Sequence, residues 1–286
     1  MIEKPTIPLA EWPGLSNVKI LRGDLIHPIV SGNKLYKLLP IIDKARSQNK
    51  STLISVGGRY SNHLHALAWA GREFNFNTVG VVRGFSAQEL TPTLMDCITW
   101  GMSIHFVDFQ MYEQRYSPEF WQPWLDKYDR SFPIYEGGWS EEAIAGSKSW
   151  WRSIPSTTDV VICAIGSGST FSGLLMSAPY NVEVIGVPVF KDPDQYTDLR
   201  SKITGVTGLN KSLPLWEGFA GRGFGKLSAE QKNFKVWFEG RTGIPLDPVY
   251  TAKAFYALHT QLALNPSLQN KNIVIMHSGG LQGNRT

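Results

Sequence analysis

The feature that most constrains the fold of this chain is that three short apolar runs each end in a loop of glycine and serine. Residues 51–56 lead into GGRYSN, residues 159–168 end in GSG, and residues 272–280 end in HSGG. Such β-branched runs alternate with helical patterns, which is typical of a parallel α/β sheet. Because ligands bind outside the carboxyl ends of strands in these sheets, three polar loops at that edge predict one shared site.

The remaining apolar runs extend the same alternation. Further strands are expected at 77–84, 102–108 and 182–189, and helices are expected at 63–74, 86–101, 170–178 and 255–264. The stretch 109–158 is less regular and rich in Trp, Tyr, Ser and Pro, and its tryptophans are interpreted as core or interface residues without a chemical role.

The composition fits a globular enzyme that handles anions. Of the 286 residues, 42% are hydrophobic and 18% are charged, which is enough apolar material for a sizeable core. The net charge of +4 is mild and spread along the chain, so it does not indicate a nucleic-acid partner.

Several features favour the cytoplasm and argue against a metal. Cys97 and Cys163 lie far apart without metal spacing, which is typical of buried cysteines in a reducing compartment. The first residues show no signal peptide, and no stretch approaches 18 apolar residues, so we expect no membrane span. No HExxH, histidine cluster or paired-carboxylate motif occurs, so we predict no catalytic metal.

The run GSGST indicates a phosphate cradle. Gly166 and Gly168 allow the backbone to approach a ligand, and Ser167, Ser169 and Thr170 add hydroxyls. The helix that follows supplies free N–H groups. An ordinary glycine-rich turn is the competing interpretation. A nucleotide-binding oxidoreductase, with Glu183 on the ribose, is a second alternative, although Phe171 interrupts a GxGxxG pattern.

The run SGNKLYKL (31–38) indicates a reactive amine. Lys34 follows a Gly-Asn turn and leads a helix, with Lys37 one turn later. A lysine that is desolvated at such a place loses its charge readily and can attack an aldehyde. Taken alone, Lys34 could be a solvated surface charge, as most lysines are.

Two further motifs could contact a ligand. In GGRYSNHLH (57–65), Ser61 and Asn62 are either helix-capping residues or part of a carboxylate cradle. In PLDPVYTAK, the Asp-Pro pair initiates a helix whose first turn contains Tyr250 and Thr251, and either side chain could face a cavity or simply pack.

In HSGG, Ser278 could hydrogen-bond a ligand heteroatom, whereas His277 is interpreted as structural.

Taken in order, SGNKLYKL, GGRYSNH, GSGST, LDPVYTAK and HSGGL resemble the motifs of the 1-aminocyclopropane-1-carboxylate (ACC) deaminase / D-cysteine desulfhydrase family. These are fold-type II pyridoxal 5'-phosphate (PLP) enzymes related to the tryptophan synthase β subunit. The resemblance runs from about Leu21 to the C-terminus. It implies two three-layer α/β/α domains with mostly parallel sheets. We expect a large PLP-binding domain from 1–45 plus 151–286 and a small α/β domain from 46–150.

The resemblance also implies roles for individual residues. Lys34 would be the Schiff-base lysine and, with Tyr250 and Ser61, catalytic. Asn62 would contact the cofactor's ring hydroxyl, and Ser278 or Thr251 would face its pyridine nitrogen. The full set implied for the cofactor is Asn33, Lys34, Lys37, Asn62, Gly166, Ser167, Gly168, Ser169, Thr170, Thr251 and Ser278. The set implied for the substrate is Ser61, Asn62, His63, Tyr250 and Phe224.

Departures from the ACC deaminase pattern favour a desulfhydrase. Thr251 and Ser278 stand where those enzymes have Glu and Leu, and His63 follows the desulfhydrase form SNH. Phe224 replaces a family tyrosine and lacks its hydroxyl. The expected reaction is β-elimination from a small amino acid such as D-cysteine, giving pyruvate, ammonia and sulfide. An ACC deaminase and a non-catalytic relative are the alternatives, and the family resemblance suggests a homodimer.

Overall fold

A computed structural model describes residues 7–85, 90–209 and 212–285 of the chain. The chain divides into two compact units, Met1–Asn33 with Ser147–Leu281 and Lys34–Gly146 with Gln282–Thr286. Helix α1 (Asn33–Ser47) therefore lies almost entirely in the second unit. The division into 1–45 plus 151–286 and 46–150 stays a prediction.

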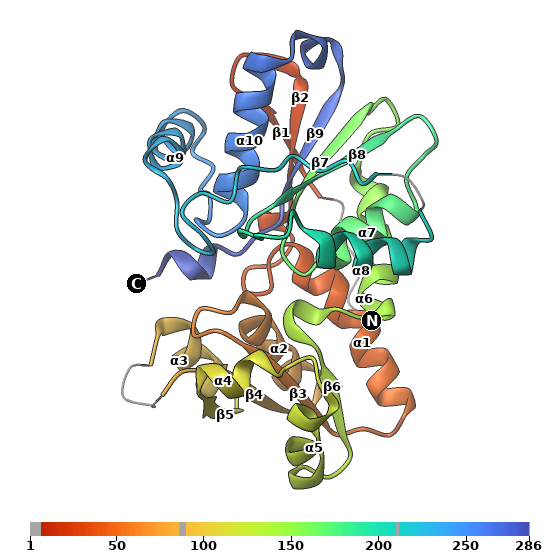
Figure 1. The fold of residues 1–286 in the computed structure, drawn as a ribbon, viewed down its shortest axis with the longest axis vertical. Coiled ribbons are helices and arrows are strands. Elements are labelled where there is room, and N and C mark those ends of the chain that lie inside the picture. Colours follow the sequence, from red (N-terminus) through yellow and green to blue (C-terminus); the bar gives the residue numbers. More distant parts are fainter. Residues whose placement is uncertain (1–6, 86–89, 210–211, 286) are drawn as a thin grey trace. The chain divides into compact units, whose positions relative to one another are not determined.

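The first unit is built on a five-stranded sheet with the strand order β1-β2-β9-β7-β8 (Figure 1). Its strands are β1 (Leu9–Trp12), β2 (Leu15–Arg22), β7 (Val160–Ile165), β8 (Glu183–Pro188) and β9 (Ile273–His277). β1 and β2 form an antiparallel hairpin, and the other neighbours are parallel. Every residue of β7 and β9 is buried, as expected for central strands of a parallel sheet.

Helices cover both faces of this sheet. They are α7 (Ser169–Met176), α8 (Thr197–Thr207), α9 (Ala229–Thr242) and α10 (Thr251–Leu264). Phe255 of α10 belongs to the same buried cluster as Ile162 and Ile185. A Cβ at Gly186 would meet Ile165 and Phe171, so α7 packs on the opposite face from α10. α7 begins directly after the loop that follows β7, and Tyr250, the residue before α10, lies against Gly166 of that loop.

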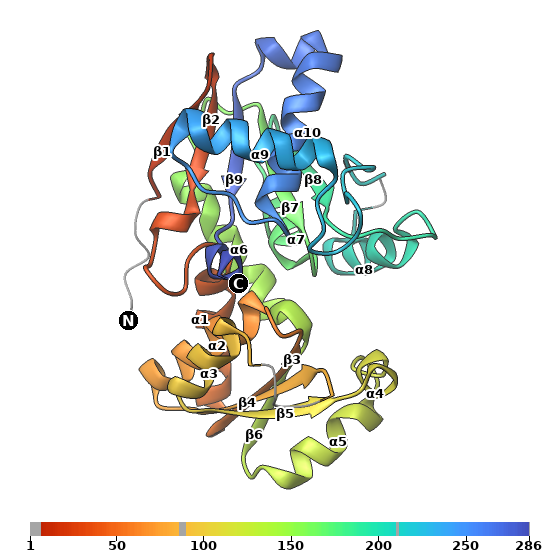
Figure 2. The same ribbon diagram turned by 90° about the vertical axis from the view of Figure 1, so that its left-hand side faces the viewer.

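The second unit contains a four-stranded parallel sheet with the order β5-β4-β3-β6 (Figure 2). Its strands are β3 (Thr52–Gly57), β4 (Asn77–Arg83), β5 (Met102–Val107) and β6 (Ser131–Ile134). The other helices of this unit are α2 (Asn62–Phe74), α3 (Pro92–Thr99), α4 (Phe109–Glu113), α5 (Pro118–Lys127) and α6 (Glu141–Ser147). Short 3-10 helices occur in the chain at Gly23–Leu25, Glu136–Gly138, Lys148–Ser153, Pro266–Asn270 and Leu281–Asn284.

The six strands expected from apolar runs are all present, and the α/β fold class is confirmed. Helix α3 falls within the expected segment 86–101, of which residues 86–89 lie outside the described residues. The β1–β2 hairpin, β6 and the helices of 109–158 were not predicted from the sequence, and neither were α8 and α9. In the described ranges, no helix is long and apolar enough to cross a bilayer.

One expectation about the sheet is wrong. The three polar loops were expected at one edge, but β3, which precedes GGRYSN, pairs with β4 and β6 in the four-stranded sheet. The loops after β7 and β9 belong to the five-stranded sheet. Apolar runs of similar composition carry no information about which strands pair, and this is why the assignment failed.

Candidate active site

The loop after β7 has the backbone geometry of an anion cradle. Gly168 adopts a φ of 96° immediately before α7, a conformation that favours glycine. A Cβ at Gly166 would come within 2.9 Å of the Tyr250 ring, so a side chain there would clash. Ser169 and Thr170 are buried in the first turn of the helix, where N–H groups lack intrahelical partners. The loop can therefore bring its backbone close to a phosphate.

Asn33 connects three of the predicted motifs. Its side-chain amide donates to the Thr170 hydroxyl at 3.1 Å, and its backbone N–H donates to the Ser278 carbonyl at 3.2 Å. Within the loop itself, the hydroxyls of Ser167 and Ser169 lie 3.2 Å apart. Since Lys34 follows Asn33 directly in the chain, the residue before the predicted reactive amine is fixed on the predicted phosphate loop.

Two glycines make this arrangement possible. Gly32 has a φ of 70°, and a Cβ there would overlap the Ser278 carbonyl at 1.7 Å. Gly279 has a φ of 76°, and a Cβ there would lie 2.7 Å from the Ser31 hydroxyl. The backbones of SGN and HSGG therefore lie in direct contact, which only glycine permits.

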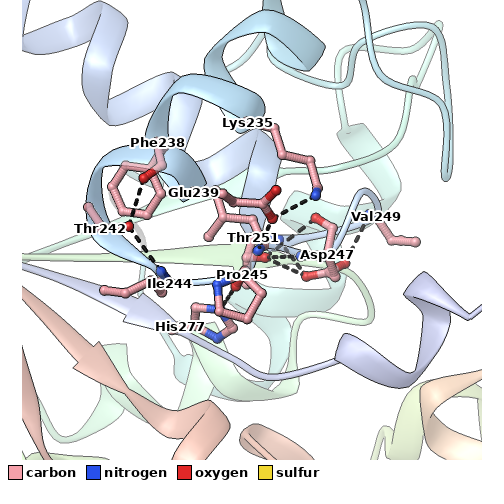
Figure 3. Close-up of polar contacts among 11 residues, drawn as sticks. Lys235, Phe238, Glu239, Thr242, Ile244, Pro245, Asp247, Val249, Thr251 and His277 are labelled. Carbon is pink, nitrogen blue, oxygen red and sulfur yellow. Dashed lines mark hydrogen bonds and ion pairs between the residues drawn. The ribbon is translucent and has the colours of Figure 1, made fainter.

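A buried carboxylate organises the start of α10 (Figure 3). Asp247 accepts hydrogen bonds from the backbone N–H groups of Val249, Tyr250 and Thr251 at 2.7–2.9 Å. The Thr251 hydroxyl donates to the same carboxylate at 2.6 Å and accepts from the Asp247 N–H at 2.8 Å. The hydroxyl hydrogen of Thr251 is thus engaged by Asp247 in this structure.

The segment before Tyr250 also forms hydrogen bonds with residues of β9 and α9. His277, fully buried, donates from Nε2 to the Pro245 carbonyl at 2.7 Å (Figure 3). Its Nδ1 accepts from the Gly279 N–H at 3.3 Å. Glu239 accepts from the Leu246 N–H at 2.6 Å. His277 therefore joins the HSGG loop to the segment that presents Tyr250, which agrees with its structural interpretation.

Phe224 lies beside Tyr250. The two rings meet edge to face with their centroids 6.0 Å apart, and Phe224 is 59% exposed. An apolar ring therefore lies next to the Tyr250 phenol.

In the second unit, Ser61 and Asn62 begin α2. The Ser61 hydroxyl accepts from the Leu64 N–H at 3.2 Å, and the Asn62 amide oxygen accepts from Gln282. Ser61 thus caps the helix, and Asn62 binds a residue 220 positions away, at the N-terminal end of a 13-residue helix where the dipole favours an anion.

His63 is held in a single tautomer. The Ser55 hydroxyl donates to the Ile134 carbonyl at 2.7 Å, so its only hydrogen is used. His63 Nε2 lies 3.0 Å from the same Ser55 oxygen and must therefore be the donor, which leaves Nδ1 as an acceptor. This Nδ1 atom is buried without a hydrogen-bond partner in the part of the chain that the structure describes.

The environment also keeps the His63 imidazole neutral. Burial, followed by the positive charges of Lys34 and Lys37, lowers the His63 pKa well below 6.5. A neutral ring with a lone pair on Nδ1 cannot donate from that atom to a carboxylate.

Lys37 is buried and donates to the Gly137 carbonyl at 3.3 Å. The adjacent Glu136 accepts from Tyr112 at 2.6 Å and from Arg115 at 2.6 Å. The stretch 109–158, to which the sequence analysis gave no chemistry, therefore anchors the turn that contacts Lys37. No motif marks these residues, because their partners are more than 20 positions away.

Comparison with known proteins identifies the family. Residues 5–279 match the model of the family described as pyridoxal-phosphate dependent enzyme. The chain belongs to this family. Its cofactor is therefore PLP, as the sequence analysis predicted.

The PLP-dependent enzyme has similar curated relatives. It is 27% identical to the bifunctional D-cysteine desulfhydrase/1-aminocyclopropane-1-carboxylate deaminase, mitochondrial, of Arabidopsis thaliana, over 96% of this chain and 76% of that protein. It is 24% identical to the D-cysteine desulfhydrase of Salmonella paratyphi A, over 95% of this chain and 89% of that protein. A solved structure described as an ACC deaminase homologue superposes with a TM-score of 0.83 at 24% identity, covering 99% and 92% of the two chains, which supports the fold.

The described residues fit this cofactor. The glycine cradle before α7 suits a phosphate, and Lys34 is a half-buried amine directly after the residue that contacts this cradle. Among residues 7–85, 90–209 and 212–285, no group of three or more His, Cys, Asp or Glu side chains could hold a metal ion.

Proposed function

We propose that the enzyme catalyses β-elimination from a small D-amino acid of the D-cysteine type, releasing pyruvate, ammonia and sulfide. When bound, PLP supplies an electron sink for the electrons of the broken Cα–H bond. The names of the relatives support this reaction and also its alternative, ACC deamination.

We assign the cofactor contacts to the residues around Asn33. Lys34 carries the cofactor through its amine, and loop 166–170 holds the phosphate, with Asn33 bracing Thr170. Ser278 is our choice for the pyridine nitrogen, because the hydroxyl hydrogen of Thr251 is engaged by Asp247. A neutral hydroxyl does not enforce protonation of that nitrogen as a carboxylate would. The cofactor ring would then be a weaker electron sink, which favours prompt elimination over a long-lived carbanion.

On the family resemblance, we assign the substrate carboxylate to the Ser61 hydroxyl and the first N–H groups of α2, and we assign the Tyr250 phenol to substrate contact. Once the substrate has displaced it, the Lys34 amine takes the proton from Cα. Sulfide then leaves from Cβ without a second acid, since it is a good leaving group. Water hydrolyses the remaining enamine to pyruvate and ammonia.

The observation that carries the choice of reaction is the pairing of Phe224 with Tyr250. A cyclopropane ring opens only when a group assists at a ring carbon, and a phenyl ring at position 224 offers neither acid, base nor nucleophile. Elimination of sulfide has no such requirement.

The test is pyruvate release from D-cysteine, β-chloro-D-alanine and ACC at equal concentration. We expect D-cysteine or β-chloro-D-alanine to give the highest kcat/KM. ACC as the best substrate would overturn the proposal in favour of the deaminase. If none of the three reacts, a gain of activity in Phe224→Tyr would show that the missing hydroxyl limits turnover, and no gain would favour a non-catalytic relative.

We further propose that the enzyme is a cytoplasmic homodimer with the two domains 1–45 plus 151–286 and 46–150. The family resemblance supports the dimer, and light scattering on the purified holoenzyme tests it. A monomer mass would contradict the proposal.

A further inference from the structure

Lys253 is a buried charge outside the residues used above. It lies in the first turn of α10 with no exposed surface, between core residues Ala252 and Ala254. Its ammonium donates to the Val189 carbonyl at 2.7 Å and to the Gly223 carbonyl at 2.8 Å. Burying an ammonium is costly unless it is hydrogen-bonded, so these two main-chain oxygens form an internal cation site.

The second carbonyl belongs to the turn that presents Phe224. In this turn, the Arg222 N–H donates to the Lys226 carbonyl and the Lys226 N–H donates to the Gly223 carbonyl, both at 3.0 Å. Gly223 has a φ of 126°, and Phe224 follows it against Tyr250. Lys253 therefore fixes the residue directly before the side chain that stands beside Tyr250.

Two charged groups thus hold the two members of the aromatic pair. Asp247 fixes the backbone of Tyr250, and Lys253 fixes the turn of Phe224. Burial lowers the pKa of Lys253 to about 8, and the negative charge of Asp247 opposes this shift. The amine is therefore still largely an ammonium at neutral pH, and charge-assisted hydrogen bonds are stronger than neutral ones.

We propose that Lys253 is a positioning residue for substrate selection: its ammonium holds turn 220–226 so that residue 224 stands against Tyr250 beside the substrate. This inference rests on the proposed function only where it concerns the substrate. The hold on the turn is a property of the protein alone and can be measured without turnover.

The first experiment measures amide hydrogen exchange in the holoenzyme. Lys253→Met keeps the apolar stem and removes the donors, and Lys232→Met, an exposed lysine on α9, is the control. We expect exchange in 220–226 to rise about tenfold, the equivalent of one charge-assisted hydrogen bond, with β7 and β9 unchanged. Unchanged exchange in 220–226 would overturn the proposal.

The second experiment is a kinetic double-mutant cycle with Phe224→Ala, using the best substrate of the panel. We expect Lys253→Met to raise KM more than it lowers kcat, and to have little further effect once Phe224 is removed. Additive effects would show that Lys253 does not act through residue 224 and would overturn its role in selection. If no substrate reacts, the proposed function fails while the exchange experiment still decides the hold on the turn.

If Lys253→Met does not fold, Lys253→Ala is purified in ammonium chloride and, in parallel, in sodium chloride. A free ammonium ion can occupy the space between the two carbonyls. Recovery of folded protein in ammonium but not in sodium supports the internal cation site, and equal behaviour in both salts overturns it.

Discussion

The two units of the enzyme hold their predicted site residues in opposite ways. The predicted site residues of the first unit lie in 166–170, 247–251 and 278–280, which we call the cradle region. There, Asp247 receives four hydrogen bonds. Those of the second unit lie in 34–37, 61–63 and 136–138, which we call the amine region, and there the buried Nδ1 atom of His63 has no hydrogen-bond partner in the described residues. The difference teaches that the cradle is preorganised, whereas the amine region retains an unused acceptor that can respond to a ligand.

Such an acceptor is costly, since an unpaired buried polar atom destabilises a protein by about 1–3 kcal/mol. Fully partnered groups make a region rigid, and removing one of them leaves its buried partners without hydrogen bonds. Substitutions in the cradle region should therefore affect stability and cofactor retention, and substitutions in the amine region should affect chemistry and pH dependence.

The largest effect is expected in the amine region. Lys34→Ala should lower turnover by about three or more orders of magnitude, because one amine serves both to carry the cofactor and to move the proton. Pyruvate release measures this, with Lys44→Ala on the same helix as a control that retains activity. Borohydride reduction and peptide mapping of the unaltered enzyme should place the pyridoxyl label on Lys34, and a label on Lys37 would refute the assignment.

The next effect tests the cradle region. Gly168→Val forces a β-branched residue into a φ of 96° and places a side chain at the predicted phosphate, so PLP should be lost on dialysis. The cofactor absorbance after dialysis measures retention. Gly205→Val, in the exposed part of α8, should keep its cofactor. Equal retention in both variants would count against the placement of the phosphate on 166–170.

Stability should separate the two regions more finely. Asp247→Ala removes the acceptor of four hydrogen bonds in a buried setting and should cost about 3 kcal/mol of unfolding free energy. Urea unfolding measures the loss, with the exposed Asp198→Ala as the control. A loss no greater than that of the control would mean that the cradle region is not held by Asp247.

The smallest effect concerns the protonation of His63. Its pKa in the folded protein lies below 6.5, so the unfolded chain binds the additional proton as the pH falls. The contribution of neutral His63 to the free energy of unfolding should therefore be complete above pH 6.5. It should decrease by about 1.4 kcal/mol per pH unit from there down to the pKa of His63 in the folded protein. Unfolding at several pH values should show that His63→Gln removes this component.

Nitrogen NMR of the same residue gives an independent readout. In the unaltered protein, His63 should show a protonated Nε2 and an unprotonated Nδ1, and Ser55→Ala should relax this preference. The opposite tautomer would remove the distinction drawn between the two regions.

His105→Gln is the control for the pH-dependent unfolding. His105 is half-buried and its pKa is also lowered, and its replacement should change the pH dependence of the free energy of unfolding less than His63→Gln does.

Local patterns were sufficient for six strands and for the helices α1, α2, α3, α7 and α10. The runs that became β3, β4, β5, β7, β8 and β9 are short and apolar, and β3, β7 and β9 are buried along their whole length, as expected for strands inside a parallel sheet. The hairpin β1–β2 was missed because its burial pattern is irregular, and β6 was missed because SFPI is short and contains proline.

For the site, the sequence by itself determined which positions have special chemistry. Gly168 and Gly279 adopt positive φ values, which residues with a Cβ rarely adopt, and Lys34 follows a turn that contains Gly32, also at positive φ. The motif order also carried the family and the cofactor, since both depend on residue types at fixed spacing. The roles of the individual site residues stay predictions.

Only the tertiary structure decided which partners these residues have. It gave the Thr251 hydrogen to Asp247, fixed the His63 tautomer through Ser55, and buried Lys253 against two carbonyls. The physical reason is that a hydrogen bond depends on the position of both partners. When Lys253 contacts Gly223, 30 positions away, that geometry is set by the packing of whole elements and leaves no local pattern.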